Sequence, residues 1–578
     1  MSTATPPADA AAGATFLGHP RGLVILFLTE MWERFSYYGM RALLIVYLTQ
    51  HFLFSDEKSS LIYGAYTALV YVMTIIGGSL ADRYLGARKA VTFGAILLTL
   101  GHFGMAFEGS GSTQYLDYEG QSYEIALDGR GGDARQQIFA GDGKSYIAFS
   151  EGGVAIEDTG FAQTAALPSL IPSDAFELRV EREDTYVFIL YLSLALLIAG
   201  VGFLKANIST IVGSLYGFGD TRRDSGFTIF YMGINLGAFS ASILCGYLGI
   251  VHGWKYGFGL AGIGMLLGLA IFLWGQKWLE GRAEPPNPAA LKEKLFAGIN
   301  REWACYLAGI GIIVLSLILV MNEGIVGYIL LPIGLCMFAF FLYFANFRCE
   351  GDEKSRMLAA CYFVLAQIPF WALFEQAGSS LNLFTTRLVE REIFGLTVPG
   401  PVFQSLNAGY IFLFAPLMAW LWVWLAKRNL NPSSPVKFAI GVAFAGLGFL
   451  SLVAGIQSTD AGVLTPVIFI FLIYWIHTIG ELMVSPVGLS VVTKLAPARV
   501  VGMTMGAWFL YSGLSNYLAG VIAQTTGAET IGGQITDVAA AQAGYVAVYS
   551  KVGYIALAIA LAMLLVSPLV KKAMRGAE

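Results

Sequence analysis

The stretch LTEMWERFSYYGM, residues 28–40, places three ionisable side chains inside a long apolar run. The flanking residues are almost all apolar, so Glu30, Glu33 and Arg34 fall near the middle of a membrane-spanning helix. A charge at that depth costs roughly 2–3 kcal/mol or more unless it is paired or wetted. Residues of this kind therefore mark a substrate or ion pathway by default.

The composition of the whole chain supports a membrane setting. Of its 578 residues, 56% are hydrophobic and 13% are charged, whereas about 25% are charged in ordinary soluble domains. A membrane helix needs about 20 mainly apolar residues. We predict an all-α, polytopic protein with fourteen such helices, centred near residues 36, 71, 99, 199, 237, 268, 312, 336, 368, 416, 447, 475, 512 and 559.

The charge distribution predicts the orientation. Short loops rich in Lys and Arg stay in the cytoplasm, and an N-terminus-inside topology leaves 22 Lys/Arg inside and 5 in short external loops. Residues 1–21 predict a disordered tail, and the apolar run after them is too long and too charged for a cleavable signal peptide. We therefore expect a multi-pass protein of the cell (inner) membrane with both termini cytoplasmic, ending in a tail at residues 571–578.

Two polar segments divide the helices. Residues 108–185 form a Gly-rich insertion whose strand-like alternation predicts a small β-rich extracytoplasmic subdomain, which offers a surface to an unidentified external partner. Residues 280–294 form a charged, Pro-containing linker. The expected order is a six-helix bundle at 22–278, the linker with two extra helices at 279–356, and a second six-helix bundle at 357–570. All five cysteines lie in or beside predicted helices, which favours inert packing over a disulfide framework.

The first helix has one polar face. At 100° per residue, six side chains fall within an arc of about 140°, and they are Glu30, Glu33, Arg34, Tyr37, Tyr38 and Arg41. A purely structural ion-pair cluster is one interpretation. Further charges in later helices, Lys205, Glu375 and Glu481, favour a functional one.

Five segments carry a family resemblance. Residues 30–39, EMWERFSYYG, resemble the ExxERFxYYG signature of the proton-coupled oligopeptide transporter (POT) family, a branch of the major facilitator superfamily. The other segments that resemble family motifs are GGSLADRYLGARKAV (77–91), FYMGINLGAF (230–239), FWALFEQAGSSL (370–381) and GELMVSPVGLS (480–490). The resemblance implies the major facilitator fold, with two six-helix bundles and the extra helix pair seen in bacterial members. The chain departs from the family pattern in having Ala206 after Lys205, where Pro is usual, and no His before Tyr71, which leaves proton transfer to carboxylates.

The resemblance also implies a function. The chain is expected to be a proton-coupled symporter that imports di- and tripeptides by alternating access, and neither an enzyme nor the holder of a cofactor or metal. Arg34 and Lys205 would bind the peptide carboxylate, with Tyr38 and Tyr71 as hydroxyl donors. The amino terminus would contact Glu481, Asn407 and Asn235. The remaining expected substrate-binding residues are Tyr37, Ser485 and Trp508.

Proton coupling is expected to use the same charges. Glu30, Glu33 and Lys205 would exchange partners around Arg34, while Arg41 and Glu375 would form a bridge between the halves that opens and closes. Protons, peptides and the lipid bilayer are the expected partners, with no nucleic acid. The absence of a GxxxxGK[ST] loop leaves direct ATP drive unsupported.

Some of these residues have a simpler interpretation. Asn235 and Asn407 also suit hydrogen bonds between helices, and Tyr71 and Trp508 suit packing. His102 and His477 are interpreted as satisfied neighbours, not as proton carriers. Two other functions stay open, a symporter of nitrate or another small anion and a receptor or channel with the insertion as its sensor. The retained acids of the first helix and Glu481 argue against the anion symporter.

Overall fold

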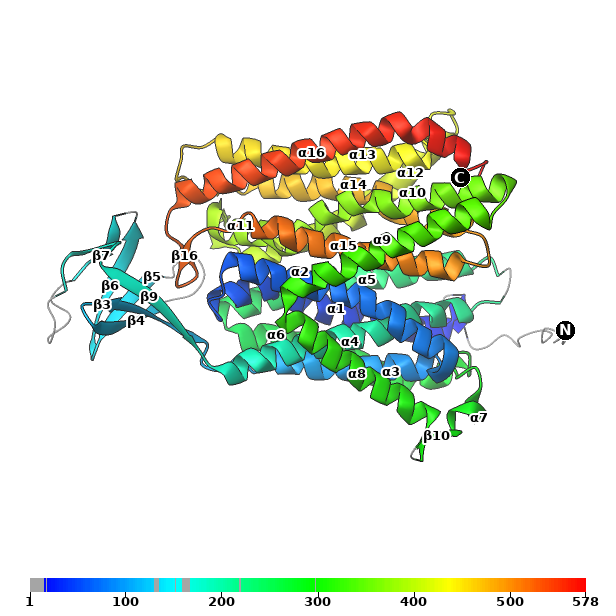
Figure 1. The fold of residues 1–578 in the computed structure, drawn as a ribbon, viewed down its shortest axis with the longest axis horizontal. Coiled ribbons are helices and arrows are strands. Elements are labelled where there is room, and N and C mark those ends of the chain that lie inside the picture. Colours follow the sequence, from blue (N-terminus) through cyan, green and yellow to red (C-terminus); the bar gives the residue numbers. More distant parts are fainter. Residues whose placement is uncertain are drawn as a thin grey trace.

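The computed structural model describes residues 15–16, 18–128, 135–150, 152–158, 167–217, 220–296 and 298–577. Within them, fourteen helices of 19 residues or more run along the long axis of the molecule (Figure 1), and every predicted centre falls inside one. They are α1 Arg21–Gln50, α2 Asp56–Leu80, α3 Ala87–Met105, α4 Asp184–Ser214, α5 Arg223–Val251, α6 Trp254–Gly275, α8 Arg301–Met321, α9 Glu323–Phe347, α10 Gly351–Phe374, α12 Ser405–Ala426, α13 Ser434–Gln457, α14 Ile468–Leu495, α15 Val501–Gln524 and α16 Val538–Ala573.

Three of the fourteen helices are more polar than a typical membrane-spanning helix. Among the described residues, 11 helical stretches are long and apolar enough to cross a membrane by length and composition, and α1, α3 and α15 lie outside that set. Most of α1 is buried by its neighbours, α5 and α6 above all. A helix surrounded by protein needs no continuous apolar surface, so α1 can carry charges that a lipid-facing helix could not.

The helices form two bundles joined by a pair. Helices α1–α6 enclose one apolar core, and α10 and α12–α16 enclose another. Of the extra pair, α8 packs against α4 and α2, whereas α9 packs against α15 and α10, so the pair reaches both bundles. We call the bundles the N half and the C half. The predicted major facilitator arrangement of six, two and six helices is confirmed, and α10 begins at Gly351, ahead of the expected boundary at residue 357.

Glycines let the central helices approach closely. A Cβ on Gly237 of α5 would lie 2.2 Å from the carbonyl oxygen of Met31 on α1. A Cβ on Gly77 of α2 would lie 2.3 Å from the carbonyl oxygen of Gly202 on α4. Small residues at such crossings are typical of membrane helix packing, and here they bring α1, α2, α4 and α5 together around the charged residues.

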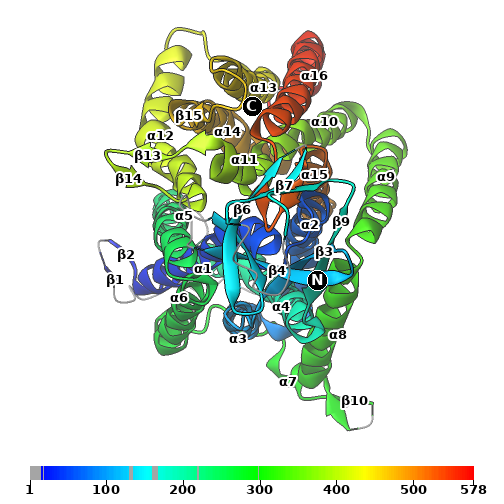
Figure 2. The same cartoon turned by 90° about the vertical axis from the view of Figure 1, so that its left-hand side faces the viewer.

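The insertion folds as a seven-stranded antiparallel sheet in the order β8-β7-β6-β5-β4-β3-β9, which confirms the predicted β-rich subdomain. Its strands are β3 Ser112–Tyr118, β4 Gln121–Asp128, β5 Arg135–Ala140, β6 Gly143–Ser150, β7 Gly153–Ile156, β8 Leu170–Pro172 and β9 Phe176–Arg182. Figure 2 looks onto this sheet, which stands in front of the ends of the helices. We call this end of the molecule the sheet end and the opposite one, where α1 begins and α16 stops, the tail end (Figure 1).

Short elements complete the chain. The loop motif at 77–91 contains a π-helical turn, η1 Ala81–Leu85. The others are β1 Thr15–Phe16, β2 His19–Pro20, η3 Gln276–Leu279, α7 Pro288–Leu291, β10 Lys294–Phe296, β11 Ile299–Asn300, η4 Glu375–Gly378, α11 Ser380–Leu388, β12 Val389–Glu390, β13 Glu392–Ile393, β14 Leu396–Thr397, η5 Gly400–Gln404, β15 Thr465–Pro466, β16 Thr530–Ile531 and β17 Gln534–Ile535. Strands β1 and β2 pair within the tail predicted to be disordered, whose residues 1–14 and 17 lie outside the described residues.

Candidate functional site

The charged residues of α1 form a buried cluster. Arg34 Nε lies 3.0 Å from Glu30 Oε1 and 2.5 Å from Glu33 Oε2. The three residues are at most 3% exposed, because helical spacing of three and four residues stacks them on one face that α1 turns toward the protein interior. Arg34 Nη2 forms no hydrogen bond with any described residue. The guanidinium thus keeps an N–H group for a further oxygen.

Lys205 on α4 lies beside this cluster. Its Nζ is 4.1 Å from the centroid of the Tyr71 ring on α2, a cation–π contact. It is also within electrostatic range of Glu33, Glu30 and Arg34. The N half therefore brings two cations and two acids of α1 and α4 together, and the Tyr71 ring contacts one of the cations, Lys205.

Aromatic rings extend this cluster along α1. The guanidinium carbon of Arg34 lies 5.5 Å from the centroid of the Tyr37 ring. Tyr37 and Tyr38 meet edge to face with their centroids 5.3 Å apart. Tyr38 is within electrostatic range of Arg34 and Arg41 and of the acids Glu375 and Glu481. Tyr38 is therefore close enough to interact with charged groups of both halves.

The C half contributes an acid held by an amide. Asn407 Nδ2 on α12 donates to Glu481 Oε2 on α14 at 2.8 Å, and the same group lies 3.1 Å from Thr478 Oγ1. Glu481 is 9% exposed. Thr478 is absent from the residues predicted from sequence, although it stands about one helical turn before Glu481 on the same face. The C half thus holds a buried carboxyl group, whereas the cations Arg34 and Lys205 belong to the N half.

An ion pair joins the halves. Arg41 Nη2 of α1 contacts Glu375 Oε2 of η4, and Arg41 Nε donates to the Tyr63 hydroxyl of α2 at 2.6 Å. Gly378, also in η4, makes room for this group, since a Cβ there would lie 1.7 Å from the Tyr63 oxygen. The structure thus brings together two residues predicted to meet, and their role in proton coupling stays a prediction.

Three other predicted binding residues lie on α5, α15 and α14. Asn235 Nδ2 donates to the carbonyl of Tyr231 on its own helix at 3.1 Å. The Trp508 indole is 5% exposed and packs against Gly488 of α14, while Ser485 is half-buried on the same helix. These contacts leave their roles in binding as predictions.

The two histidines of the helices are both buried. Neither ring nitrogen of His102 has a hydrogen-bond partner among the described residues, and His477 Nε2 lies 3.0 Å from the carbonyl oxygen of Ala445. Within the described part of the chain, no three His, Cys, Asp or Glu side chains gather as a metal site. The five cysteines are free, with Cys336 alone exposed.

A second ion pair between the halves lies at the sheet end, and it is buried. Arg387 Nη1 on α11 donates to Asp56 Oδ2 at the start of α2 at 2.7 Å, and both side chains are at most 4% exposed. Arg387 is not among the three cations predicted inside helices, Arg34, Arg41 and Lys205. The helical stretch that begins at Gly351 continues through η4 to Leu388, and this continuation places Arg387 inside it.

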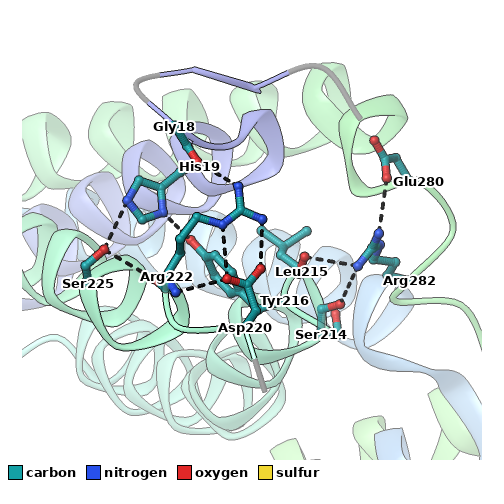
Figure 3. A network of polar contacts seen from close by, with 10 residues as sticks. All are labelled: Gly18, His19, Ser214, Leu215, Tyr216, Asp220, Arg222, Ser225, Glu280 and Arg282. Carbon is teal, nitrogen blue, oxygen red and sulfur yellow. Dashed lines mark hydrogen bonds and ion pairs between the residues drawn. The ribbon is translucent and has the colours of Figure 1, made fainter. Parts of the chain in front are cut away.

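A polar network lies at the tail end of the N half, around His19 (Figure 3). His19 Nδ1 lies 2.8 Å from the Tyr216 hydroxyl, and its Nε2 lies 3.1 Å from Ser225 Oγ. Arg222 donates to the Gly18 carbonyl and to both oxygens of Asp220. The hydrogen bonds that the Arg222 side chain and backbone N–H donate to Asp220 lower the pKa of its carboxyl to about 2. The network ties the segment before α1 to the connection between α4 and α5.

Comparison with known sequences identifies the family. A sequence model described as the POT family matches residues 88–538 of this chain. The chain belongs to the POT family. Its relatives include the uncharacterised transporter YclF of Bacillus subtilis, 33% identical over 97% of this chain and 96% of the relative, and the peptide transporter YePEPT of Yersinia enterocolitica, 32% identical over 90% of each.

Solved POT structures share the fold. A crystal structure of a POT peptide transporter with sulfate has a TM-score of 0.72 and 31% identity, with 98% of each chain covered. A POT transporter with bound 5-aminolevulinic acid has a TM-score of 0.71 and 28% identity, with 96% of this chain and 98% of that one covered. POT members are transporters and not enzymes, so this POT chain is a multi-pass membrane transport protein.

Proposed function

We propose that this chain imports di- and tripeptides together with protons across the cell membrane by alternating access. Relatives that span nearly the same length are named peptide transporter or dipeptide and tripeptide permease. The surplus of Lys and Arg in one set of loops supports an orientation with the tail end in the cytoplasm and the sheet end outside.

One observation carries the substrate assignment: the N half presents cations and the C half presents a carboxylate, and Tyr38 is within electrostatic range of charged groups in both. A short peptide is a zwitterion whose ends are constant and whose side chains vary. Arg34 and Lys205 bind its carboxylate, because a guanidinium and an ammonium both suit carboxylate oxygens. Glu481, oriented by Asn407, binds its ammonium group.

The side chains of the peptide need a tolerant surface. Tyr37, Tyr71 and Trp508 provide aromatic area, and Asn235 and Ser485 provide polar groups at the edge. Aromatic rings contact apolar and polar side chains alike, so such a lining accepts peptides of different sequence. Both ends of the peptide remain fixed while its middle varies.

Proton coupling follows from competition for Arg34 and Lys205. A carboxylate beside a cation stays ionised, whereas one that loses its partner in a dry site is driven to bind a proton. When the peptide carboxylate occupies Arg34, Glu33 and Glu30 lose part of their compensation and take up a proton. Peptide and proton therefore bind together.

The conformation supports a site that faces the cytoplasm. Polar contacts between the halves gather toward the sheet end: Arg41 with Glu375, Asp56 with Arg387, and Asn382 Nδ2 donating to the Ala42 carbonyl at 2.9 Å. Opening the sheet end requires these contacts to separate. Release of the Arg41–Glu375 pair, with Glu375 protonated, provides one step of that change.

Uptake into proteoliposomes tests the proposal. When the outside is more acidic than the lumen, purified protein should accumulate a labelled dipeptide above equilibrium. A protonophore should abolish this accumulation. An anion symporter would instead accumulate nitrate and ignore dipeptides. A channel would equilibrate its solute without accumulation, which would contradict a symporter.

A further inference from the structure

The hairpin β16–β17 of the C half ends in a turn that only small residues allow. Ile531 pairs with Gln534, so Gly532 and Gly533 form a two-residue turn. Their φ angles are +56° and +77°, the positive values that a type I′ turn requires at both positions and that glycine adopts without strain. The sequence IGGQ therefore encodes a tight turn between α15 and α16.

Two glutamines of the inserted sheet form hydrogen bonds with one peptide group of this turn. Gln136 Nε2 on β5 donates to the carbonyl oxygen of Ile531, and Gln114 Oε1 on β3 accepts from the N–H of Gly532. This carbonyl and this N–H belong to the same peptide bond. Both glutamines are at most 9% exposed, so the two hydrogen bonds form away from water, where an unpaired partner is costly.

Apolar packing reinforces the contact. The Ile531 side chain is 7% exposed and lies in the apolar cluster of the sheet, with Leu116, Ile125 and Ile138 among its neighbours. A Cβ on Gly532 would lie 3.0 Å from Gln136 Nε2, and one on Gly533 would lie 3.1 Å from the carbonyl of Thr49 in α1. The turn thus fits closely between the sheet and the end of α1.

The contact joins the two halves. The sheet lies between α3 and α4 and is tied to the N half by Arg182, which donates to the carbonyls of Phe52 and Leu53 at 2.7 and 2.6 Å. The hairpin belongs to the C half. Just before it in the chain, the N–H of Ala528 donates to Asp56 at 3.2 Å, on the same oxygen that Arg387 contacts. Figure 2 shows the sheet reaching over this region.

We propose that Gln114 and Gln136 form a latch that binds the β16–β17 turn, stabilises the closed sheet end, and releases the turn when the halves separate there. The proposal rests on alternating access, the proposed function of the chain. A contact that persists throughout the cycle would instead make the sheet a fixed pivot, which is the competing outcome of the test.

The test compares a double variant of the latch with a control variant in the same sheet. Gln114→Ala/Gln136→Ala removes both hydrogen bonds to the turn. Gln137→Ala is the matched control, because Gln137 is equally buried but donates to Asp128 inside the sheet. Nitroxide labels at Lys144→Cys in the sheet and Leu396→Cys in the C half, both exposed positions, report the separation, with exposed Cys336 replaced by Ser.

The latch predicts a defined change in the label distances. In lipid nanodiscs at acidic pH, the double variant should raise the ratio of long to short distances about tenfold over the unsubstituted protein, as expected for losing one to two buried hydrogen bonds. The Gln137→Ala control should change this ratio by less than about twofold. Equal ratios in the double variant and the control would overturn the latch, and a single short distance under all conditions would establish the pivot.

A second variant covers a failure of the double variant to fold, and the distance measurement separates the latch from the proposed substrate. If the double variant does not fold, Ile531→Ala loosens the same contact from the hairpin side and should give the same direction of change. The distance measurement needs no transport, so a shifted ratio in a protein that fails to take up peptide would contradict the proposed substrate and leave the latch standing.

Discussion

Arg41 of α1 and Glu375 of η4 form a largely buried ion pair that links the N half to the C half, and Arg41 also donates to the Tyr63 hydroxyl. Separating the two charges without replacing them would leave each unpaired in a dry interior, which costs about 3–5 kcal/mol for comparable buried pairs. A proton on Glu375 removes most of that cost. The pair therefore ties opening of the sheet end to protonation under the proposed mechanism.

Gly378→Ala tests the space around this pair. The added methyl would overlap the Tyr63 hydroxyl, and overpacking of this kind typically costs about 1–3 kcal/mol. We expect a lower thermal midpoint in detergent and slower uptake. Tyr63→Phe in the same chain should recover part of the loss, and a double variant no better than Gly378→Ala would show that the clash lies elsewhere.

Glu33→Gln should abolish proton-driven accumulation and preserve some exchange of peptide for peptide. Glu33 contacts Arg34 and is within electrostatic range of Lys205, so a neutral amide removes a proton carrier without removing the cations that bind the carboxylate. Accumulation and counterflow in the same proteoliposomes measure the two activities separately. Normal accumulation under a pH gradient would exclude Glu33 from coupling.

Glu481→Gln should weaken binding of ordinary dipeptides by about tenfold or more, since a charge-assisted hydrogen bond to the ammonium becomes a neutral one. N-acetylated dipeptides carry no ammonium, so their binding should change much less. Competition against a labelled peptide gives both affinities. Equal losses for the two ligands would place Glu481 outside the ammonium site.

Replacing residues 108–185 with a short Gly/Ser linker should preserve folding and most peptide uptake. Strands β3 and β9 pair from Ser112 with Arg182 onward, so the two ends of the insertion leave the helices side by side, and closing a short loop there costs little. The distribution between open and closed sheet ends should shift, because the latch is lost. A well-folded deletion protein without any uptake would show that the insertion completes the transport site.

The sequence predicts the helices and the motif residues because both leave local signals. Mainly apolar runs locate all fourteen helix centres, although α1, α3 and α15 are more polar than the rest. Helical spacing places Glu30, Glu33 and Arg34 on one face. The meeting of Arg41 with Glu375 follows from charge balance in an apolar interior. Alternating polarity likewise reveals strands in the insertion.

The remaining contacts depend on partners far away in the chain. Arg387 lies 331 positions from Asp56 and Gln136 lies 395 positions from Ile531, so no local pattern reports either pair. Tyr63 and Thr478 carry no charge, and their neighbours identify them only once the helices are packed. The turn at Gly532 and Gly533 is the exception, since a Gly-Gly pair flanked by short β segments is a hairpin signal in itself.

The latch has a consequence for biosynthesis. The sheet is complete once Arg182 has been made, about 350 residues before the hairpin, an interval of about 20–70 seconds at typical translation rates of 5–20 residues per second. During that time the apolar site for Ile531 has no occupant from this chain. The nascent sheet must therefore stay folded and avoid other partners outside the membrane while ten further helices are inserted, and docking of the turn is one of the last steps of assembly.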